Sequence, residues 1–300
     1  MKKVTAVVVT YNRLEMLKKT IEFLSCQEYH CDIIVINNAS TDETENWLRE
    51  YTENSDSVSY YNTGKNIGGA GGFNFGMKKA VENGCEYVWI MDDDCMTHKD
   101  TLKELMKADA VLGENYGYLS SVVLWTDGTE CKMNRQKIKK SYYEYSHLLS
   151  EGLIQVEQST FVSLLFPVRT LKKVGLPITD FFIWGDDIEF TRRITVRNSM
   201  PSFMVTSSKV THAMKANSGS SIATDEAERI DRYRYAFRNE GYLYRKEGLK
   251  GVCYYIAKCA LNFLRILTKA KDNRLKRCRV LIASMFRGLF FNPKTEFIQE

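Results

Sequence analysis

The apolar positions of the chain alternate between short continuous runs and longer stretches with helical spacing. Residues 4–9 and 32–36 are continuous runs rich in β-branched side chains, which is typical of strands buried on both faces of a sheet. Residues 12–27 lie between them and carry apolar side chains at every third or fourth position, which predicts a helix. Strands that alternate with helices indicate a parallel sheet covered by helices on both faces.

The alternation continues along most of the chain and then gives way to a helical pattern. Further predicted strands cover residues 58–61, 86–91, 118–125, 158–167, 181–184 and 202–210. Predicted helices follow residue 41 and the glycine-rich stretch near residue 70, and cover residues 99–112, 169–174 and about 187–198. Residues 127–151 are polar and rich in tyrosine, so we expect a loop or hairpin over the site. Residues 225–300 have helical spacing, an excess of Lys and Arg, and many Tyr, Phe and Leu residues.

Polar sequences follow the carboxyl ends of the first four predicted strands. They are TYNR, NNAST, GKNIGGAGG and DDD, which begin at residues 10, 37, 64 and 92. Ligands of parallel sheets bind at this edge. We therefore expect one crevice to collect all four.

Composition excludes several classes of protein. The 300 residues are 44% hydrophobic and 26% charged, as in a folded globular protein. The net charge of +5 is too mild to indicate nucleic-acid binding. The eight cysteines show no metal-binding spacing, so reduced thiols in the cytoplasm are the simplest interpretation. No apolar run reaches the roughly 18 residues of a spanning helix.

The triple aspartate at the end of the fourth predicted strand is a candidate metal site. If the backbone stays extended, Asp92 and Asp94 project to the same side and Asp93 to the other. Two carboxylates at a strand end suit Mg²⁺ or Mn²⁺, which usually complete their shell with phosphate oxygens. His212, after a later strand, is a candidate third ligand. The alternative is an acidic loop that caps the next helix, with His212 an ordinary polar residue.

The glycine-rich stretch from residue 64 to 76 is a candidate phosphate cradle. Glycines let backbone N–H groups approach a diphosphate at the start of a helix. It is neither a P-loop nor the dinucleotide fingerprint, because its spacing and its place after the third strand differ from both. The alternative is a tight turn with close helix packing.

A second acidic cluster, Asp186 and Asp187, follows the apolar run FFIW at residues 181–184 and Gly185. Such a run would deliver both carboxylates to the same crevice, where one could accept a proton from a hydroxyl nucleophile. Two arginines at 192 and 193 could offset their charge. The alternative is a helix N-terminus whose acids favour the helix dipole.

Taken in order, the motifs VVVTYNR, IVINNASTD, NIGGAGGFNFG, WIMDDDC and FFIWGDDIEF with a later His resemble an inverting family-two glycosyltransferase of the GT-A fold. The resemblance covers about residues 3–221. Residues 66–72 are its most discriminating part and resemble bacterial galactofuranosyltransferases and their rhamnosyltransferase-like relatives. That pattern tends to place Trp directly before the double Asp, whereas here Gly185 takes that place and Trp184 comes one residue earlier.

The resemblance implies a role for each matching position. Asp187 would be the general base, with Asp186, Glu189 and Trp184 on the acceptor side. The metal ligands would be Asp92, Asp94 and His212, for Mn²⁺ or Mg²⁺. The donor would be bound by Thr10, Tyr11, Arg13, Asn38, Asn66, Gly68, Gly69, Gly71, Gly72, Asp92 and Asp93, with Asn38 holding the edge of the base.

The fold class expected from this resemblance is α/β, a GT-A fold with a mostly parallel sheet and a helical C-terminal region. Residues 1–222 would be the catalytic domain, with a nucleotide-sugar half at 1–95 and an acceptor half at 96–222. Residues 223–300 would be a basic helical region on the inner membrane surface, or else packed on the catalytic domain or in a homodimer contact.

The expected activity is transfer of galactofuranose from UDP-galactofuranose to a glycan acceptor, which the resemblance implies to be lipid-linked, in cell-surface polysaccharide synthesis. Transfer of rhamnose from dTDP-rhamnose is the first alternative. Two other classes compete: a nucleotidyltransferase, and a non-catalytic scaffold at the membrane surface. The sequence TYNRLEML after the first strand argues against the nucleotidyltransferase, and the intact acid clusters argue against the scaffold.

Overall fold

The computed structural model describes residues 2–113, 115–141 and 143–298. Within these residues, ten strands form one sheet. Its order is β3 (Val58–Asn62), β2 (Asp32–Asn37), β1 (Val4–Thr10), β4 (Tyr87–Asp92), β9 (Leu164–Pro167), β6 (Leu119–Trp125), β10 (Ser202–His212), β8 (Leu153–Gln158) and β7 (Lys137–Ile138), with β5 (Cys95–Thr97) paired to β10. Strands β3, β2, β1 and β4 are parallel, and the antiparallel strand β9 separates them from the parallel pair β6 and β10.

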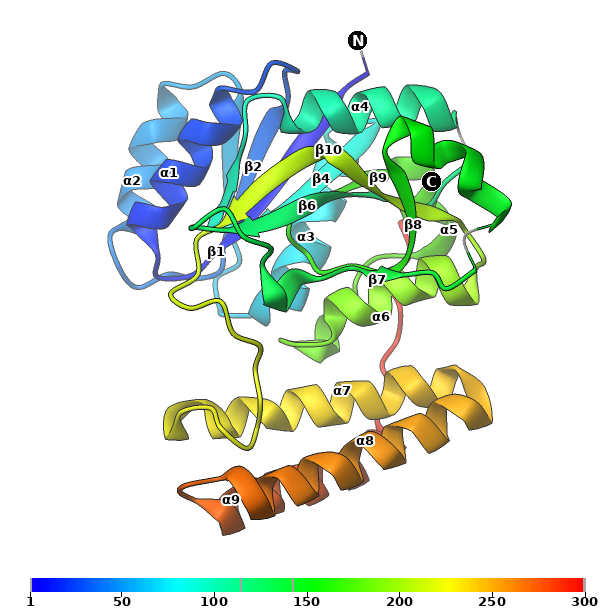
Figure 1. Ribbon diagram of the computed structural model, residues 1–300. Helices are drawn as coiled ribbons and strands as arrows, with labels where there is room; N and C mark the ends of the chain where they lie inside the picture. Colours follow the sequence, from blue (N-terminus) through cyan, green and yellow to red (C-terminus); the bar gives the residue numbers. More distant parts are fainter. Residues whose placement is uncertain (1, 114, 142, 299–300) are drawn as a thin grey trace.

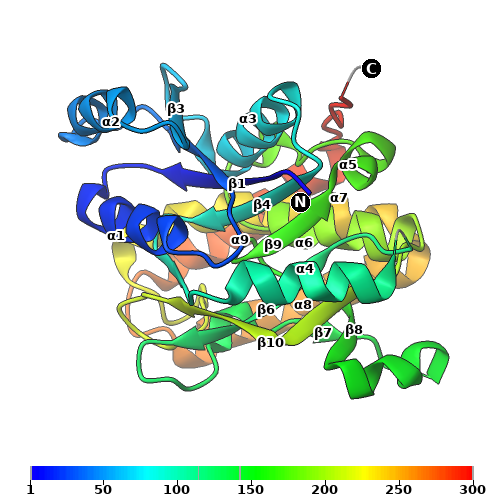
Figure 2. The same cartoon turned by 90° about the horizontal axis from the view of Figure 1, so that it is seen from above.

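Helices cover both faces of the sheet, and each face has its own apolar core (Figures 1 and 2). One core includes buried residues of α1 (Leu14–Ser25), α2 (Thr44–Glu53) and α4 (Thr101–Leu112). The other includes residues of α3 (Gly68–Glu82), α5 (Val168–Val174) and α6 (Asp186–Arg192). In β1, Ala6 and Val8 join the first core while Val7 and Val9 join the second. This explains why the strand is apolar at nearly every position.

The predicted fold class is confirmed, but the predicted strand at residues 158–167 is wrong. It is divided between two strands: β8 ends at Gln158 and β9 begins at Leu164. β8 pairs with β10 and β7, whereas β9 lies between β4 and β6 near the middle of the sheet. One continuous strand cannot occupy both places, so residues 159–163 form a loop between them.

The predicted strand at residues 181–184 is also wrong. A 3₁₀ turn covers Thr179–Phe181, and Phe182 and Trp184 have positive φ angles of 64° and 63°. Asn239, which is fully buried, donates hydrogen bonds to the carbonyl oxygens of Phe181, Ile183 and Trp184 at 3.0, 3.2 and 2.8 Å. The apolar side chains of this turn therefore pack on the C-terminal helices instead of joining the sheet.

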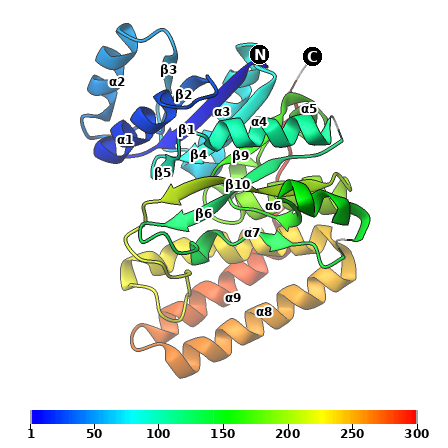
Figure 3. The same cartoon turned by 45° about the horizontal axis from the view of Figure 1, so that its top comes forward.

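The C-terminal region forms a separate helical layer below the sheet (Figure 1). It contains α7 (Tyr233–Lys246), α8 (Gly248–Lys269) and α9 (Arg274–Phe290), and Figure 3 shows α8 and α9 side by side beneath α7. This layer has its own apolar core. The predicted helical region is thus confirmed as far as Phe290, whereas residues 291–298 are not helical and residues 299 and 300 lie outside the described residues.

Several contacts attach this helical layer to the rest of the molecule. Arg192 of α6 binds both carboxylate oxygens of Glu247 at 2.6 and 2.7 Å. After α9 the chain returns toward α5, where the N–H of Leu176 donates to the carbonyl of Glu296 at 2.8 Å (Figure 1). The domain boundary at residue 222 stays a prediction. Within the described residues, no helix combines the length and hydropathy that crossing a membrane requires.

Candidate active site

Two acids and a histidine meet at the carboxyl edge of the sheet. Asp92 is the last residue of β4, Asp94 lies in the turn that follows, and His212 is the last residue of β10. The antiparallel pairing of β5 with β10 places His212 opposite Cys95 and therefore beside Asp94. One ligand atom from each of the three side chains lies within 4.8 Å of the other two. The cluster could hold a metal ion, with oxygen and imidazole nitrogen as donors.

His212 and Arg13 offset the charge of Asp94, whereas the carboxylates of Asp92 and Asp94 repel each other. His212 Nε2 is 2.9 Å from Asp94 Oδ1, and Arg13 lies 2.8 Å from Asp94 Oδ2. Burial acts to raise the pKa of Asp94, but the hydrogen bond and charge of His212 and the charge of Arg13 lower it to about 2. Burial acts to lower the pKa of His212, but the hydrogen bond to Asp94 raises it to about 10. Burial, followed by the charge of Asp94, raises the pKa of Asp92 to about 7.

Asn134 fixes the orientation of the His212 ring. Its amide oxygen accepts a hydrogen bond from His212 Nδ1 at 2.8 Å, and another from the thiol of Cys131 at 3.0 Å. Its amide nitrogen donates to Thr160 Oγ1 at 2.9 Å. Because an amide oxygen can only accept, Nδ1 carries a proton and Nε2 is the atom presented to the acids.

The structure separates Asp93 from the other two aspartates, as predicted, although the backbone turns here instead of staying extended. Asp93 accepts a hydrogen bond from Thr10 Oγ1 at 2.7 Å and pairs with Arg13 at 2.8 Å. Thr10 is buried, and Arg13 binds Asp93 and Asp94 together. Their side chains therefore organise the acid cluster. The prediction that Thr10 and Arg13 line the nucleotide pocket is not supported by these contacts.

A first cavity of about 450 Å³ lies beside the glycine-rich turn. Tyr11, Asn38, Asn66, Gly68 and Gly69 line one side, as predicted. The other lining residues are Phe182 and Ile183, from the turn before the aspartate pair, and Asp231, Arg232, Arg234 and Tyr235. Tyr11 is half exposed, whereas Asn38 is buried.

The side chain of Asn38 is fully occupied by this turn. Its oxygen accepts hydrogen bonds from the N–H of Ile67 at 2.9 Å and from Thr63 Oγ1 at 3.2 Å. Its nitrogen donates to the carbonyl oxygen of Gly68 at 3.1 Å and to Asn66 Oδ1 at 3.3 Å. The prediction that Asn38 holds the base edge needs a free hydrogen-bonding group, and the side chain offers none in this arrangement.

The glycines of the motif have two different roles. A Cβ on Gly69 would meet nothing within 4 Å, so this residue opens onto the cavity. A Cβ on Gly72 would lie 2.6 Å from a Val9 methyl group, and one on Gly71 would lie 2.9 Å from Ile67. Gly72 thus gives α3 its close packing on β1, and Gly71 packs on Ile67. Neither residue lines the two cavities, so these contacts do not support the prediction that they bind the donor. Gly68 has a φ of 74°, and its Cβ position would overlap the carbonyl of Phe182.

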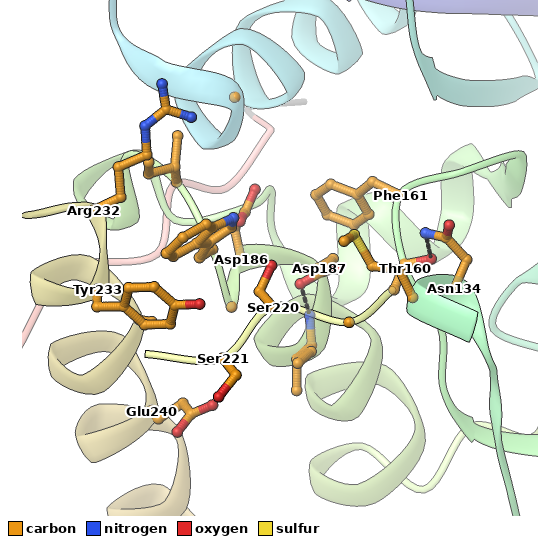
Figure 4. A pocket seen from close by; sticks show the side chains of 18 of the residues that line it. Asn134, Thr160, Phe161, Asp186, Asp187, Ser220, Ser221, Arg232, Tyr233 and Glu240 are labelled. Atoms are coloured by element: carbon orange, nitrogen blue, oxygen red, sulfur yellow. Dashed lines mark hydrogen bonds between the residues drawn. The ribbon is translucent and has the colours of Figure 1, made fainter. Parts of the chain in front are cut away.

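A second cavity of about 640 Å³ brings the two acidic clusters together. Asp92 and His212 lie on its wall with Asp186 and Asp187, and Figure 4 shows Asp187 near Thr160, Phe161 and Ser220. Both cavities share Gly69, Ile183 and Arg232, so they are adjoining parts of one crevice.

Asp186 and Asp187 differ in their protonation. Burial, followed by repulsion from Asp187, raises the pKa of Asp186 well above its usual range. Burial raises the pKa of Asp187 to about 6, opposed by its hydrogen bond from the N–H of Ile188 at 2.7 Å. At neutral pH, Asp187 is the ionised member of the pair and Asp186 holds a proton.

Three neighbours of this pair do not act on it. Glu189 is fully buried and binds Arg193 and Arg197, the latter at 2.9 Å, so the prediction that it positions the acceptor is not supported. Arg192 binds Glu157 and Glu247 instead of the aspartates. The predicted offset of charge by Arg192 and Arg193 is therefore wrong. Trp184 lies on the wall of the second cavity, and its contact with the acceptor stays a prediction.

Sequence reasoning missed several residues that line the crevice. The largest group comes from the C-terminal region and includes Arg232, Tyr233, Glu240 and Lys258. The second is Asn134, in a polar stretch that we expected only to be a loop over the site. No local motif marks these positions. Only the helical period of α7, which places Tyr233, Phe237 and Glu240 on one face, could have grouped some of them.

Comparisons with known proteins agree with this geometry. Residues 5–153 match the family model described as Glycosyl transferase family 2. Galactofuranosyltransferase GlfT1 of Mycolicibacterium smegmatis is 27% identical over 261 residues, covering 82% of this chain and 84% of that protein. Galactofuranosyltransferase GlfT1 of Mycobacterium tuberculosis H37Rv is also 27% identical, over 264 residues and the same shares of the two chains.

Solved structures share the fold at low sequence identity. GalNAc-T7 with UDP, GalNAc and Mn²⁺ has a TM-score of 0.68 and 12% identity, and the match covers 93% of this chain but 54% of that one. This chain thus spans about half the length of that protein. Mannosyltransferase PcManGT from Pyrobaculum calidifontis, in complex with GDP-Man and Mn²⁺, has a TM-score of 0.58 and 16% identity, and the match covers 96% and 87% of the two chains. At these identities the likeness shows the GT-A fold alone.

Proposed function

We propose that this chain, a glycosyltransferase with a family 2 domain on a GT-A fold, transfers galactofuranose from UDP-galactofuranose to a glycan acceptor with inversion. One observation carries the proposal. A single cavity is lined by the Asp92 and His212 of a metal-type cluster and by the unlike carboxyls of Asp186 and Asp187. The sugar assignment is supported by two relatives that are galactofuranosyltransferases. This chain matches each of them over most of its length.

The residues of the cluster fit a divalent cation. Asp92, Asp94 and His212 offer two carboxylates and one imidazole, and the mixed set favours Mn²⁺ over Mg²⁺. A bound ion would neutralise charge on the phosphates of the leaving nucleotide. Asn134 orients the imidazole, and Arg13 balances the acids on the other side of the cluster.

The aspartate pair supplies the proton transfer. Asp187, ionised at neutral pH, accepts the proton of the acceptor hydroxyl as that oxygen attacks the anomeric carbon. The new bond joins the acceptor oxygen to that carbon, while the bond from the same carbon to the phosphate oxygen breaks and UDP leaves. Attack from the face opposite the phosphate inverts the configuration in one step. Asp186, protonated, can donate a hydrogen bond to the acceptor.

The first cavity is the proposed site of the nucleotide. Tyr11 is exposed and can stack on a base, while Asn38 and Asn66 hold the shape of the glycine-rich turn. Arg232 and Arg234 line the same cavity and can offset the charge of the diphosphate. Since Arg232 lines both cavities, it lies at the junction between nucleotide and sugar.

The C-terminal helices are proposed to rest on an anionic membrane, at the inner face of the cell membrane. Exposed apolar residues recur along both helices: Leu249, Tyr254, Ile256, Leu261, Leu264 and Leu267 on α8, and Leu275, Ile282, Phe286, Leu289 and Phe290 on α9. Basic residues accompany them, and Asp272 is the single acid between residues 248 and 295. Apolar side chains and bases together favour the headgroup region of anionic lipid. This placement suits a lipid-linked acceptor.

A donor screen tests the proposed sugar. Purified full-length protein is given UDP-galactofuranose, UDP-galactopyranose or dTDP-rhamnose, with and without Mn²⁺, and nucleotide release and thermal stabilisation are measured. Selective release of UDP from UDP-galactofuranose in the presence of Mn²⁺ is the expected result. Preference for dTDP-rhamnose would replace the proposed donor with the rhamnose alternative. Nucleotide release that is unchanged after chelation would show that the reaction needs no metal ion.

A further inference from the structure

The second cavity extends beyond the aspartate pair into the C-terminal helices. Its far wall is formed by Tyr233, Phe237 and Glu240 of α7 and by Lys258, Asn262 and Arg265 of α8. Asp186 and Asp187 line the same cavity from α6. A substrate that reaches Asp187 therefore has the surface of α7 beside it.

Glu240 stands out on this wall because half of its carboxylate has no partner. Oε1 lies 2.5 Å from the Lys258 ammonium, and the side chain is only 13% exposed. Oε2 is buried and accepts no hydrogen bond from any residue that the structure describes. A buried carboxylate oxygen without a donor is unfavourable, so Oε2 is available to accept a hydrogen bond from a donor that enters the cavity.

The surroundings of Glu240 identify the kind of donor. Figure 4 shows the Glu240 carboxylate directed toward Ser221, with the Tyr233 ring on the same side of the cavity. The rings of Tyr233 and Trp184 lie 4.9 Å apart and both line the cavity. A carboxylate that accepts hydrogen bonds, in the same cavity as two aromatic rings, suits a sugar, whose hydroxyls donate and whose C–H faces are apolar.

We propose that Glu240, with Tyr233 and Trp184, forms the subsite for the acceptor sugar, and that Glu240 Oε2 accepts a hydrogen bond from a non-reacting hydroxyl of that sugar. The inference rests on the proposed glycosyltransfer. It gives the C-terminal helices a part in choosing the acceptor, apart from any contact with a membrane. In this proposal Glu240 selects the acceptor sugar, whereas Asp187 accepts the proton of the acceptor hydroxyl.

The ion pair with Lys258 offers a competing explanation, in which Glu240 only joins α7 to α8. The two roles use different oxygens, because Lys258 occupies Oε1 alone. Glu240→Gln removes the negative charge from Oε2, whereas Lys258→Met removes the ion pair and leaves the carboxylate in place. Glu228→Gln, at an exposed position that lines neither cavity, is the matched control for loss of one carboxylate.

The experiment uses full-length protein, UDP-galactofuranose, Mn²⁺ and three acceptor probes: octyl β-galactofuranoside, octyl α-rhamnoside and octyl β-N-acetylglucosaminide. UDP release without an acceptor reports on the part of the site that binds the donor. Transfer to each probe gives the KM and kcat for the acceptor. We expect Glu240→Gln to raise the KM for the best probe by about tenfold or more, with acceptor-free UDP release unchanged. Glu228→Gln should leave this KM within about threefold of wild type, and Lys258→Met, which changes the wall but keeps the carboxylate, should raise it less than Glu240→Gln does.

Deoxygenated versions of the best probe locate the hydrogen bond. Removal of the hydroxyl that Glu240 recognises should raise the KM of wild type but not that of Glu240→Gln, so the two effects are not additive. The proposal is overturned if Glu240→Gln behaves as wild type, if Lys258→Met reproduces its effect, or if no deoxy probe shows this coupling. It is equally overturned if none of the three octyl glycosides accepts sugar.

Failure of the proposed donor gives a different result. Wild type would then release no UDP from UDP-galactofuranose, while another nucleotide sugar from the screen would be turned over. The same variants and probes are then used with that donor. The outcome for Glu240 is thus read independently of the sugar that is transferred.

Discussion

Asn134 Oδ1 and His212 Nδ1 lie 2.8 Å apart, so an amide from a polar surface loop holds the imidazole of the acid cluster. The partner of a metal-bound histidine usually fixes its ring and tautomer, and its loss typically costs about 10- to 100-fold in metal affinity. Asn134→Ala should therefore weaken Mn²⁺ binding by this amount, as measured by titration calorimetry of the protein without donor. Asn46→Ala, at an exposed position on α2, is the control and should bind Mn²⁺ as wild type does. Equal Mn²⁺ affinities for wild type, Asn134→Ala and Asn46→Ala would show that Asn134 does not support the metal site.

Replacement of the proposed base should separate chemistry from donor binding. Asp187→Asn keeps the size of the side chain but cannot accept a proton, so we expect transfer to fall by about 10²- to 10⁴-fold. The affinity for UDP should be unchanged, because Asp187 does not line the nucleotide cavity. Single-turnover transfer and calorimetric binding of UDP measure the two quantities. Lost UDP affinity with intact transfer would reassign Asp187 to the donor side.

The pH dependence of transfer should report the same carboxyl. As the proposed base, Asp187 acts only when ionised, and burial raises its pKa to about 6. The rate should therefore be constant above this value and fall by about tenfold for each pH unit below it. The profile is recorded at saturating Mn²⁺ and donor, so that loss of ligand does not mimic the base. A rate that stays constant well below pH 6 would exclude Asp187 as the base.

Gly69 and Gly72, three residues apart, should respond in opposite ways to replacement by alanine. Gly72→Ala places a methyl group 2.6 Å from Val9 and should destabilise the fold by about 1–3 kcal/mol through overpacking. Gly69→Ala meets no atom within 4 Å but projects into the crevice, so it should preserve stability and weaken UDP binding. Thermal unfolding and UDP titration test both variants. An unstable Gly69→Ala or a fully stable Gly72→Ala would contradict this division.

Membrane contact should depend on the exposed apolar residues of α8 and α9. Leu264→Asp combined with Phe286→Asp should abolish flotation with vesicles of phosphatidylglycerol and phosphatidylcholine, while wild type floats and is released by high salt. Val111→Asp changes an equally exposed apolar residue on α4 and should still float. Flotation of the double variant, or its absence for wild type, would show that these helices do not bind the membrane.

The sequence predicted features whose chemistry or period is local. Residues 4–9 form a buried strand because successive side chains face the two cores, which requires an unbroken apolar run. Asp92, Asp94 and His212 could be grouped because two carboxylates end one strand and the histidine follows another, at the edge where ligands of such sheets bind.

Features set by distant contacts could not be predicted in this way. The run at 181–184 looks like a strand because it is apolar, yet its packing partner is α7, and Asn239 fixes its turns. Gly69 and Gly72 belong to one motif, but Gly69 faces the crevice and Gly72 faces the sheet, which only the start of α3 distinguishes. Asn134 and Glu240 are joined to the site by tertiary contacts that leave no pattern in their neighbours along the chain.

The three hydrogen bonds from Asn239 also limit how freely this protein can exchange parts with its relatives. The turn they hold leads directly into Gly185 and the aspartate pair, so the shape of the reaction centre depends on a residue more than fifty positions downstream. A chimera of two relatives that is joined near residue 222 would take Asp187, the proposed base, from one parent. It would take Asn239, which holds the turn before the aspartate pair, from the other. The inner face of α7 therefore has to change in step with the turn that precedes the aspartate pair, because Asn239 lies on that face.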